Sequence, residues 1–379
     1  MKNLKLIGFL MILASSLMFI QCTSDPIEGP QGIAGVDGVN GTNGLNGVNG
    51  VNGDNSCLNC HNDQFKKMAI ETFPSSGHNI AAALPGRSGA CLNCHSHEGY
   101  LASYLPGNIT TAFIPTTTTA TKITCNTCHG GGHKNVANTV AGTDFALRST
   151  EPYKLIGAGS IGTVIDYGGS SNNCIHCHQV RRAGDGYPAN ADPLNANFGK
   201  VAINSSFGPH YGGATTMLEG IDANKIAGAV AYPVAGTNPH RTGASCVSCH
   251  MGTAKDGKGS HSFKPVLDKC KTCHTGAGVV NYDINGGQTK VKNLMKDLAK
   301  EIVRLHPADF SLNDGVADIK DLGMLVMPSS TKQIPDRVAK AVFNYRYLYQ
   351  DHSYGLHNPP YARALMTNSI ADLKLLPTP

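Results

Sequence analysis

The sequence contains no tryptophan, and aromatic residues of all kinds make up only 6% of its 379 positions. Charged residues account for 15%, and the formal net charge of +5 forms no basic stripe. With so few aromatic side chains and 44 glycines, the chain has little material for a conventional hydrophobic core. Weak, scattered charge without interleaved aromatic residues also argues against nucleic acid as a partner. We therefore expect something other than aromatic side chains to fill much of the interior.

Long hydrophobic runs are missing too, apart from one near the N-terminus. Residues 6–20 are apolar and follow Lys2 and Lys5, a pattern typical of a signal peptide and short for a membrane span. We expect residues 1–21 to be a signal peptide and the chain to be exported.

Cys22 follows this segment directly and resembles the acylated cysteine of bacterial lipoproteins, although Gln21 stands where those usually have a small residue. We predict a lipid-anchored N-terminus at residues 22–28, with an incidental cysteine after plain cleavage as the alternative. The lipid anchor implies a membrane contact and an outer-membrane lipoprotein at the cell surface; otherwise the chain is expected in the periplasm.

Residues 29–55 form a segment of low complexity, in which glycine recurs at every third position from Gly29 to Gly53. This period is typical of collagen-like sequence. Pro30 is the only proline in it, so a triple helix would be marginal. Two interpretations remain open: a mobile spacer, and a stalk that joins three copies of the chain as a homotrimer.

Twelve of the 13 cysteines belong to six copies of one motif, Cys-x-x-Cys-His, which define the region 56–287. In a helical turn the residues i, i+3 and i+4 share one face, so each motif presents two thiols and an imidazole in the same direction. The copies are Cys57, Cys60 and His61; Cys91, Cys94 and His95; Cys125, Cys128 and His129; Cys174, Cys177 and His178; Cys246, Cys249 and His250; and Cys270, Cys273 and His274.

This pattern predicts six covalently bound haem c groups. The two thiols of each motif form thioethers with the vinyl groups of the porphyrin, and the adjacent imidazole binds the iron. Structural zinc and disulfides are the alternatives. Neither explains a histidine behind every cysteine pair, and free thiol pairs tend to oxidise outside the cytoplasm.

Between the motifs the sequence is rich in Gly, Ser, Thr, Asn and Pro, which favours loops and short turns of helix. We therefore expect a mostly irregular fold, with short α-helices wrapped around six c-type haems and little β-structure. Since the haems are flat and apolar, they should replace much of the usual core.

Regular structure is predicted only in the C-terminal region, 288–379, which we expect to be helical and to pack on the haems. Apolar residues recur at helical spacing over 288–305, and a second helix is expected over about 335–351. Asn358 as N-cap and Pro359 at the first helical position predict a third helix that ends near residue 375.

On these motifs, residues 57–379 resemble the multihaem c-type cytochromes, and in particular the lipid-anchored surface cytochromes of extracellular electron transfer. The resemblance implies an electron carrier with redox partners such as other cytochromes, outer-membrane electron conduits or extracellular acceptors. Four further segments are similar to those that supply the second iron ligand in that group: Ser76-Gly77-His78, Gly208-Pro209-His210-Tyr211-Gly212, His261-Ser262-Phe263 and Gly355-Leu356-His357-Asn358-Pro359.

Ten histidines lie outside the proximal position of the motifs, enough to give all six irons a second imidazole. His97, His133 and His176 lie too close to their own motifs to reach the far side of the same haem, so each could serve only a neighbouring one. Gly355 permits a sharp bend next to His357. The predicted distal ligands are His78, His133, His210, His240, His261 and His357.

Irons capped by two imidazoles leave no position for a substrate, which favours an electron conduit with no catalytic residues. The rival hypothesis is a multihaem reductase or oxidoreductase of nitrogen or sulfur compounds with one open haem. The Cys-x-x-Cys-Lys variant of cytochrome c nitrite reductases is missing, but Arg181, Arg182 and Tyr187 lie near the fourth motif. A subunit of a cytochrome filament is the third possibility.

Overall fold

The computed structural model describes residues 63–81, 91–103, 120–130, 146–155, 162–276, 279–313 and 323–378. All of them fall within one compact unit, residues 53–379. Several predictions lie outside the described residues: the signal peptide, Cys22, the glycine-rich segment, the first motif and His133. Among the described residues, no helix has the length and apolar character needed to cross a bilayer.

Short helices dominate the part that is described. The α-helices are α3 (Asp63–Thr72), α4 (Gly77–Ala81), α5 (Leu92–His95), α6 (His97–Ser103), α7 (Cys125–Cys128), α8 (Asn172–Ile175), α9 (Ala214–Glu219), α10 (Pro239–Gly243), α11 (Cys246–His250), α12 (Leu267–Lys271), α13 (Gly287–Leu305), α14 (Asp336–Asp351) and α15 (Pro359–Lys374). The 3-10 turns are η1 (Phe73–Ser75), η4 (Gly169–Ser171), η5 (Gly184–Gly186), η6 (Ser260–Ser262) and η7 (Ile284–Gly286).

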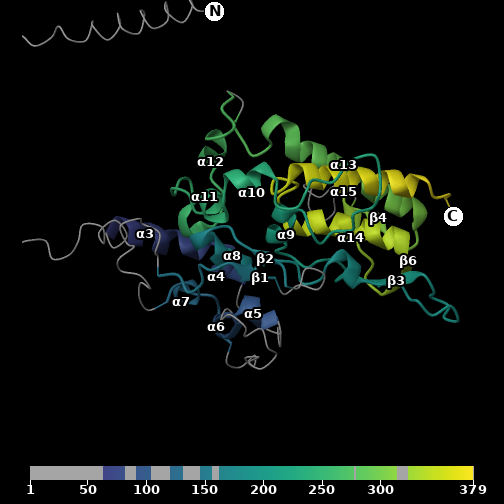
Figure 1. Ribbon diagram of the computed structural model, residues 1–379, viewed down its shortest axis with the longest axis horizontal. Helices are drawn as coiled ribbons and strands as arrows, with labels where there is room; N and C mark the ends of the chain where they lie inside the picture. The colour runs from purple at the N-terminus through teal and green to yellow at the C-terminus, as the bar shows by residue number, and fades with distance from the viewer. Residues whose placement is uncertain are drawn as a thin grey trace, which may run out of the picture. The chain divides into compact units, whose positions relative to one another are not determined.

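The described β-structure consists of three antiparallel pairs: β1 (Tyr153–Lys154) with β2 (Val164–Ile165), β3 (Lys200–Ile203) with β6 (Lys332–Pro335), and β4 (Ser311–Leu312) with β5 (Leu325–Val326). In the longest pair Val201 lies opposite Ile334, and both are buried. This pair joins the middle of the chain to the start of α14 (Figure 1). The predicted fold class, mostly irregular with short helices and little β-structure, is confirmed.

The three long helices are α13, α14 and α15, which lie side by side (Figure 1). Their bounds confirm the three predicted C-terminal helices to within one residue at most ends. The apolar residues of α13 at helical spacing, among them Val291, Leu298 and Ile302, are buried, as an amphipathic pattern requires.

The start of α15 is fixed by the residues that predicted it. The Asn358 side chain accepts a hydrogen bond from the Tyr361 backbone N–H at 3.2 Å, and Pro359 is the first helical residue. Just before it, Gly355 has φ +88°, and a Cβ there would lie 2.9 Å from Cγ2 of Val291. The bend before His357 therefore needs glycine.

A conventional side-chain core exists after all, and it corrects the expectation that little material was available for one. It joins α13, α14 and α15 to the β3–β6 pair, with Phe343, Tyr345, Tyr347 and Tyr361 among its largest buried side chains. The few aromatic residues suffice because several of them are concentrated in α14, where they pack together.

Replacing Gly355 with alanine tests the bend. We expect the free energy of unfolding to fall by about 1–3 kcal/mol, since alanine is strained at this φ and its methyl group would meet Val291. Denaturant titration of the haem-loaded protein measures the loss. Gly287→Ala is the control, because Gly287 is helical and nothing lies within 4 Å of its added Cβ. Equal stability of the two variants would contradict the argument.

Candidate haem sites

The motifs that the structure describes each lie on or beside one turn of helix. The second, third and fifth motifs occupy α5, α7 and α11. The fourth begins within α8 and the sixth within α12, and both continue beyond the end of the helix. Two of them are capped by hydroxyl side chains. The Ser245 hydroxyl accepts from the Ser248 N–H at 3.2 Å and the Ser248 hydroxyl accepts from the Ser245 N–H at 2.9 Å. Such a reciprocal cap starts the helix at the first cysteine of the motif.

The ten motif cysteines in the described part of the chain are all free thiols, with no disulfide between them. Within those residues no three His, Cys, Asp or Glu side chains converge to bind a metal ion on their own. The thiols therefore remain available for thioether bonds.

A second imidazole faces the histidine of each motif in the described residues. The ring centroids are 5.9 to 6.3 Å apart in all five pairs, and the partners come from distant parts of the chain. The pairs, with their centroid separation and the angle between the ring planes, are His78 with His178 (5.9 Å, 78°), His210 with His95 (6.1 Å, 63°), His261 with His129 (6.1 Å, 38°), His240 with His274 (6.2 Å, 73°) and His357 with His250 (6.3 Å, 35°).

These separations are those required by an iron held between two imidazoles. Two bonds of about 2 Å each, plus about 1 Å from each ring nitrogen to its ring centre, span about 6 Å. Ordinary aromatic contacts also reach this separation, as Phe343 and Tyr347 do at 6.1 Å, so the signal is its recurrence at every described motif histidine. The ring pairs therefore fit the iron of haem c, with the motif histidine on one side and the second histidine on the other.

Hydrogen bonds at Nδ1 set the tautomer of four of the paired rings. His210, His240 and His250 each place Nδ1 on a backbone carbonyl, at 2.9, 2.5 and 2.8 Å. A carbonyl only accepts, so Nδ1 carries the proton and the lone pair lies on Nε2. The fourth ring, His357, differs because its Nδ1 lies 2.7 Å from Oδ1 of Asp351. Each of the four rings can thus bind iron through Nε2.

Burial keeps other paired rings neutral. It lowers the pKa of His178 to about 3, with a further contribution from the neighbouring imidazole of His78. Burial likewise lowers the pKa of His261 to about 4, helped by His129. A neutral imidazole is the form that binds a metal, so these rings are ready for iron near neutral pH.

Five of the six histidines predicted as distal ligands are members of these pairs, and the sixth, His133, lies outside the described residues. The histidines that were not selected have other surroundings. His97 bonds the Thr127 hydroxyl at 2.9 Å, and His176 is buried and bonds the Ser103 hydroxyl at 2.9 Å. His306 lies 3.5 Å from Asp309, and His352 stacks on Tyr211.

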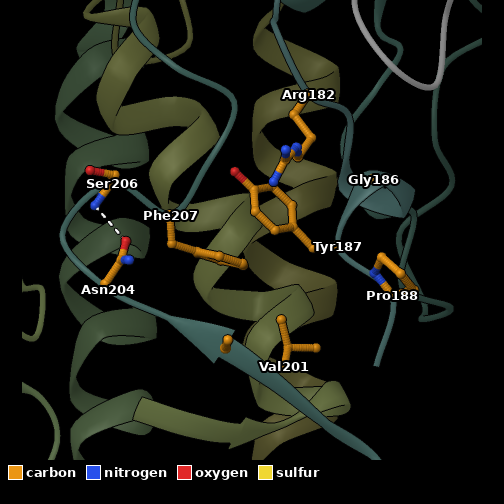
Figure 2. Close-up of a pocket in the computed structure, with 9 residues that line it drawn as sticks. Arg182, Gly186, Tyr187, Pro188, Val201, Asn204, Ser206 and Phe207 are labelled. Carbon is orange, nitrogen blue, oxygen red and sulfur yellow. Dashed lines mark hydrogen bonds between the residues drawn. The ribbon is translucent and has the colours of Figure 1, made fainter. Parts of the chain in front are cut away.

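Of the residues suggested for an open catalytic haem, Arg182 and Tyr187 line a pocket, whereas Arg181 lies beside the second motif. The Arg182 guanidinium stacks over the Tyr187 ring at 4.7 Å, and both line a pocket of about 390 Å³ together with Phe207 (Figure 2). No histidine or motif cysteine lines this pocket. Arg181 instead points Nη1 to Sγ of Cys91, 3.7 Å away. The arrangement does not join these residues to a motif histidine.

Two features of the sites were missed by sequence reasoning. One is Asp351, the last residue of α14; an acidic residue six positions before a predicted ligand is its only sequence signal. The other is Phe263, whose carbonyl accepts from His250 while its ring packs edge-on against His78. The backbone of Phe263 is left-handed, at φ +54°, so its carbonyl and its ring reach two different histidine pairs. The sequence carries no signal for this conformation.

The sequence is similar to those of known proteins. A family model described as cytochrome c552 matches residues 235–374. Two curated proteins named C-type polyheme cytochrome OmcB, from two strains of Geobacter sulfurreducens, are each 28% identical over 239 residues. The alignment covers 52% of this chain but only 28% of theirs, so the chain spans a minor part of the length of these relatives.

Two solved structures resemble the chain at a distance. The outer cell wall cytochrome OcwA has a TM-score of 0.45 at 20% identity, over 80% of this chain and 49% of its own. The undecaheme cytochrome from the S-layer of Carboxydothermus ferrireducens has a TM-score of 0.46 at 17% identity, over 81% and 41%. Similarity at this level carries no argument about function. The repeated motifs, with the family and sequence matches, support a multihaem c-type cytochrome.

Proposed function

We propose that the chain is a hexahaem electron conduit whose irons are held mainly between two imidazoles. The observation that carries the proposal is the set of five ring pairs, in which every motif histidine of the described residues faces a second imidazole about 6 Å away. A reductase needs at least one iron that a substrate can reach, and none of these five pairs offers it. We assign the sixth iron to His61, with His133 as its predicted partner.

When bound, each haem c would supply a one-electron couple at low potential. The protein's own residues hold and orient the groups. The motif cysteines tether the porphyrin edge, backbone carbonyls fix the tautomer of His210, His240 and His250, and Gly355 lets the chain turn into His357.

Contacts between motifs support a continuous path. The side chain of Cys177 contacts that of Cys94, and the side chain of Cys174 contacts that of Cys246. The fourth motif therefore lies between the second and the fifth. The fifth is joined to the segment of the sixth by a backbone bond from Val266 N–H to the Cys249 carbonyl, 3.0 Å long. Because thioethers form at the porphyrin edge, contacts between motif cysteines favour close porphyrin edges.

The location follows from the N-terminal predictions. A signal peptide, an acylated Cys22 and the glycine-rich spacer of residues 29–55 would place the haem-binding region, 56–287, and the helical region, 288–379, outside the cell on a lipid anchor. We propose the outer surface of an outer membrane, with other cytochromes or extracellular acceptors as redox partners.

Ligand binding separates the conduit from an enzyme. We expect the reduced full-length protein to show no spectral change with carbon monoxide or nitrite, since each iron already has six ligands. Absorption difference spectra before and after addition measure it. Stoichiometric binding of either ligand to one iron per chain would favour the reductase instead.

The angles between ring planes predict two classes of low-spin ferric iron. When two imidazole planes are nearly parallel, their donation splits the iron d orbitals, and when they are nearly perpendicular the orbitals stay close in energy. The pairs at 35° and 38° should give rhombic electron paramagnetic resonance signals, and those at 63°, 73° and 78° strongly anisotropic ones. A spectrum with only one class would contradict the ring geometry.

A further inference from the structure

We propose that Asp351 tunes the fifth-motif haem, by making His357 a stronger ligand and so lowering the reduction potential of that haem. The inference rests on the proposed function, in that His357 and His250 must share one iron. Asp351 would not contact the iron itself, and acts as a positioning residue through His357.

The geometry around His357 is closed and specific. Its Nδ1 lies 2.7 Å from Oδ1 of Asp351, whose side chain is 1% exposed. The second carboxylate oxygen accepts a hydrogen bond from the Ser353 hydroxyl, which in turn accepts from the His357 backbone N–H at 3.3 Å. Both carboxylate oxygens are therefore engaged, and Asp351 has one orientation relative to the ring.

The chain's fold brings these groups together at one place. Asp351 ends α14, and the turn through Gly355 leads back to His357 just before Asn358 caps α15. The carboxylate thus lies six positions before the ligand, and both flanking helices belong to the buried C-terminal core. The pair is supported by the most regular part of the structure.

Asp351 gives the Nδ1 atom of His357 a charged partner. His210, His240 and His250 donate to backbone carbonyls, which are neutral. A hydrogen bond from Nδ1–H to a buried carboxylate pulls the proton away from the ring and leaves more negative charge on it. Such a ring donates more strongly to iron and stabilises the ferric state over the ferrous one.

The buried charge acts in the same direction. In a low-dielectric site a negative carboxylate close to the iron's ligand favours the state with the higher positive charge. Charge and ligand strength therefore both lower the potential of this haem.

The test is a potentiometric titration of the full-length haem-loaded protein at one fixed pH, followed by absorption and electron paramagnetic resonance. Asp351→Asn keeps the size of the side chain and an acceptor oxygen but removes the charge. We expect the potential of one of the six one-electron transitions, carried by one of the two rhombic signals, to rise by about 59 mV, which is a tenfold change in its equilibrium constant. The other transitions should move less, and all irons should stay low-spin.

Two further variants make the result specific. Asp351→Glu restores the charge and should return the transition toward its original potential. Asp309→Asn is the matched control, because Asp309 lies 3.5 Å from His306, which faces no motif histidine among the described residues. It should leave all transitions unchanged.

Other outcomes are equally informative. Six transitions at their original potentials in Asp351→Asn, with low-spin irons, would overturn the tuning role. A high-spin iron in this variant would also overturn it, since Asp351 would then only hold the ring in place. Failure of the proposed function looks different, because the unsubstituted protein would itself bind fewer haems or contain high-spin iron.

Discussion

Replacing both Cys174 and Cys177 with serine is expected to yield protein with five haems per chain and greatly reduced stability. The fourth motif is surrounded by others: its cysteines contact Cys94 and Cys246, and its inner histidine, His176, is 1% exposed. Losing a large apolar group there leaves a cavity that neighbouring motifs share. The free energy of unfolding should fall by more than it does when a buried aromatic ring is removed, which costs about 3–5 kcal/mol.

Haem content, measured by absorption after denaturation and by mass spectrometry, and thermal unfolding test this expectation. The matched control is the double replacement of Cys270 and Cys273 in the sixth motif, where Cys273 is exposed. That variant should also lose one haem but retain most of the stability. If both double variants unfold at the same temperature, the fourth motif does not hold the central place assigned to it.

Replacing His240 with alanine should convert one of the six irons from low-spin to high-spin and make it bind carbon monoxide. His240 faces His274 at 6.2 Å, and its Nδ1 is held by the Leu356 carbonyl at 2.5 Å, so it is the second ligand that the sixth motif would use. Without it the iron keeps a single imidazole and an open side.

The control for this variant is His352→Ala. His352 is exposed, and it stacks on Tyr211 rather than facing a motif histidine. It should leave the spectrum and the lack of reaction with carbon monoxide unchanged. A fully low-spin His240→Ala protein would mean that another residue caps the iron, and would remove His240 from the ligand set.

The local features of this protein could be predicted because each depends on a few adjacent residues. The recurrence of apolar side chains in 288–305, the cap at Asn358 and the bend at Gly355 are set by short-range sterics and hydrogen bonding. The choice of His357 and four further histidines followed from flanking residues and from excluding those too close to their own motifs.

The pairing itself could not be predicted, because it depends on contacts between residues far apart in sequence. His78 faces His178 and His261 faces His129, and no spacing in the sequence specifies these partners. The β3–β6 pair joins residues more than a hundred positions apart for the same reason. Asp351 was invisible because an acid at a helix end is common and only the fold turns it toward His357.

The C-terminal core was underestimated for a different reason. Overall composition averages over the chain, whereas the aromatic residues cluster in one helix, with Phe343, Tyr345 and Tyr347 all buried within five positions of α14. A local count would have shown that this segment can form a core without help from haem.

The central claim is that iron porphyrins, tethered by the motifs and capped by two imidazoles, fill the interior between the motifs. Quantifying haem and iron in the oxidised full-length protein, together with its spin state, tests it most directly. We predict six haems and six irons per chain, all low-spin. Colourless protein, zinc in place of iron, or a substantial high-spin fraction would contradict this account.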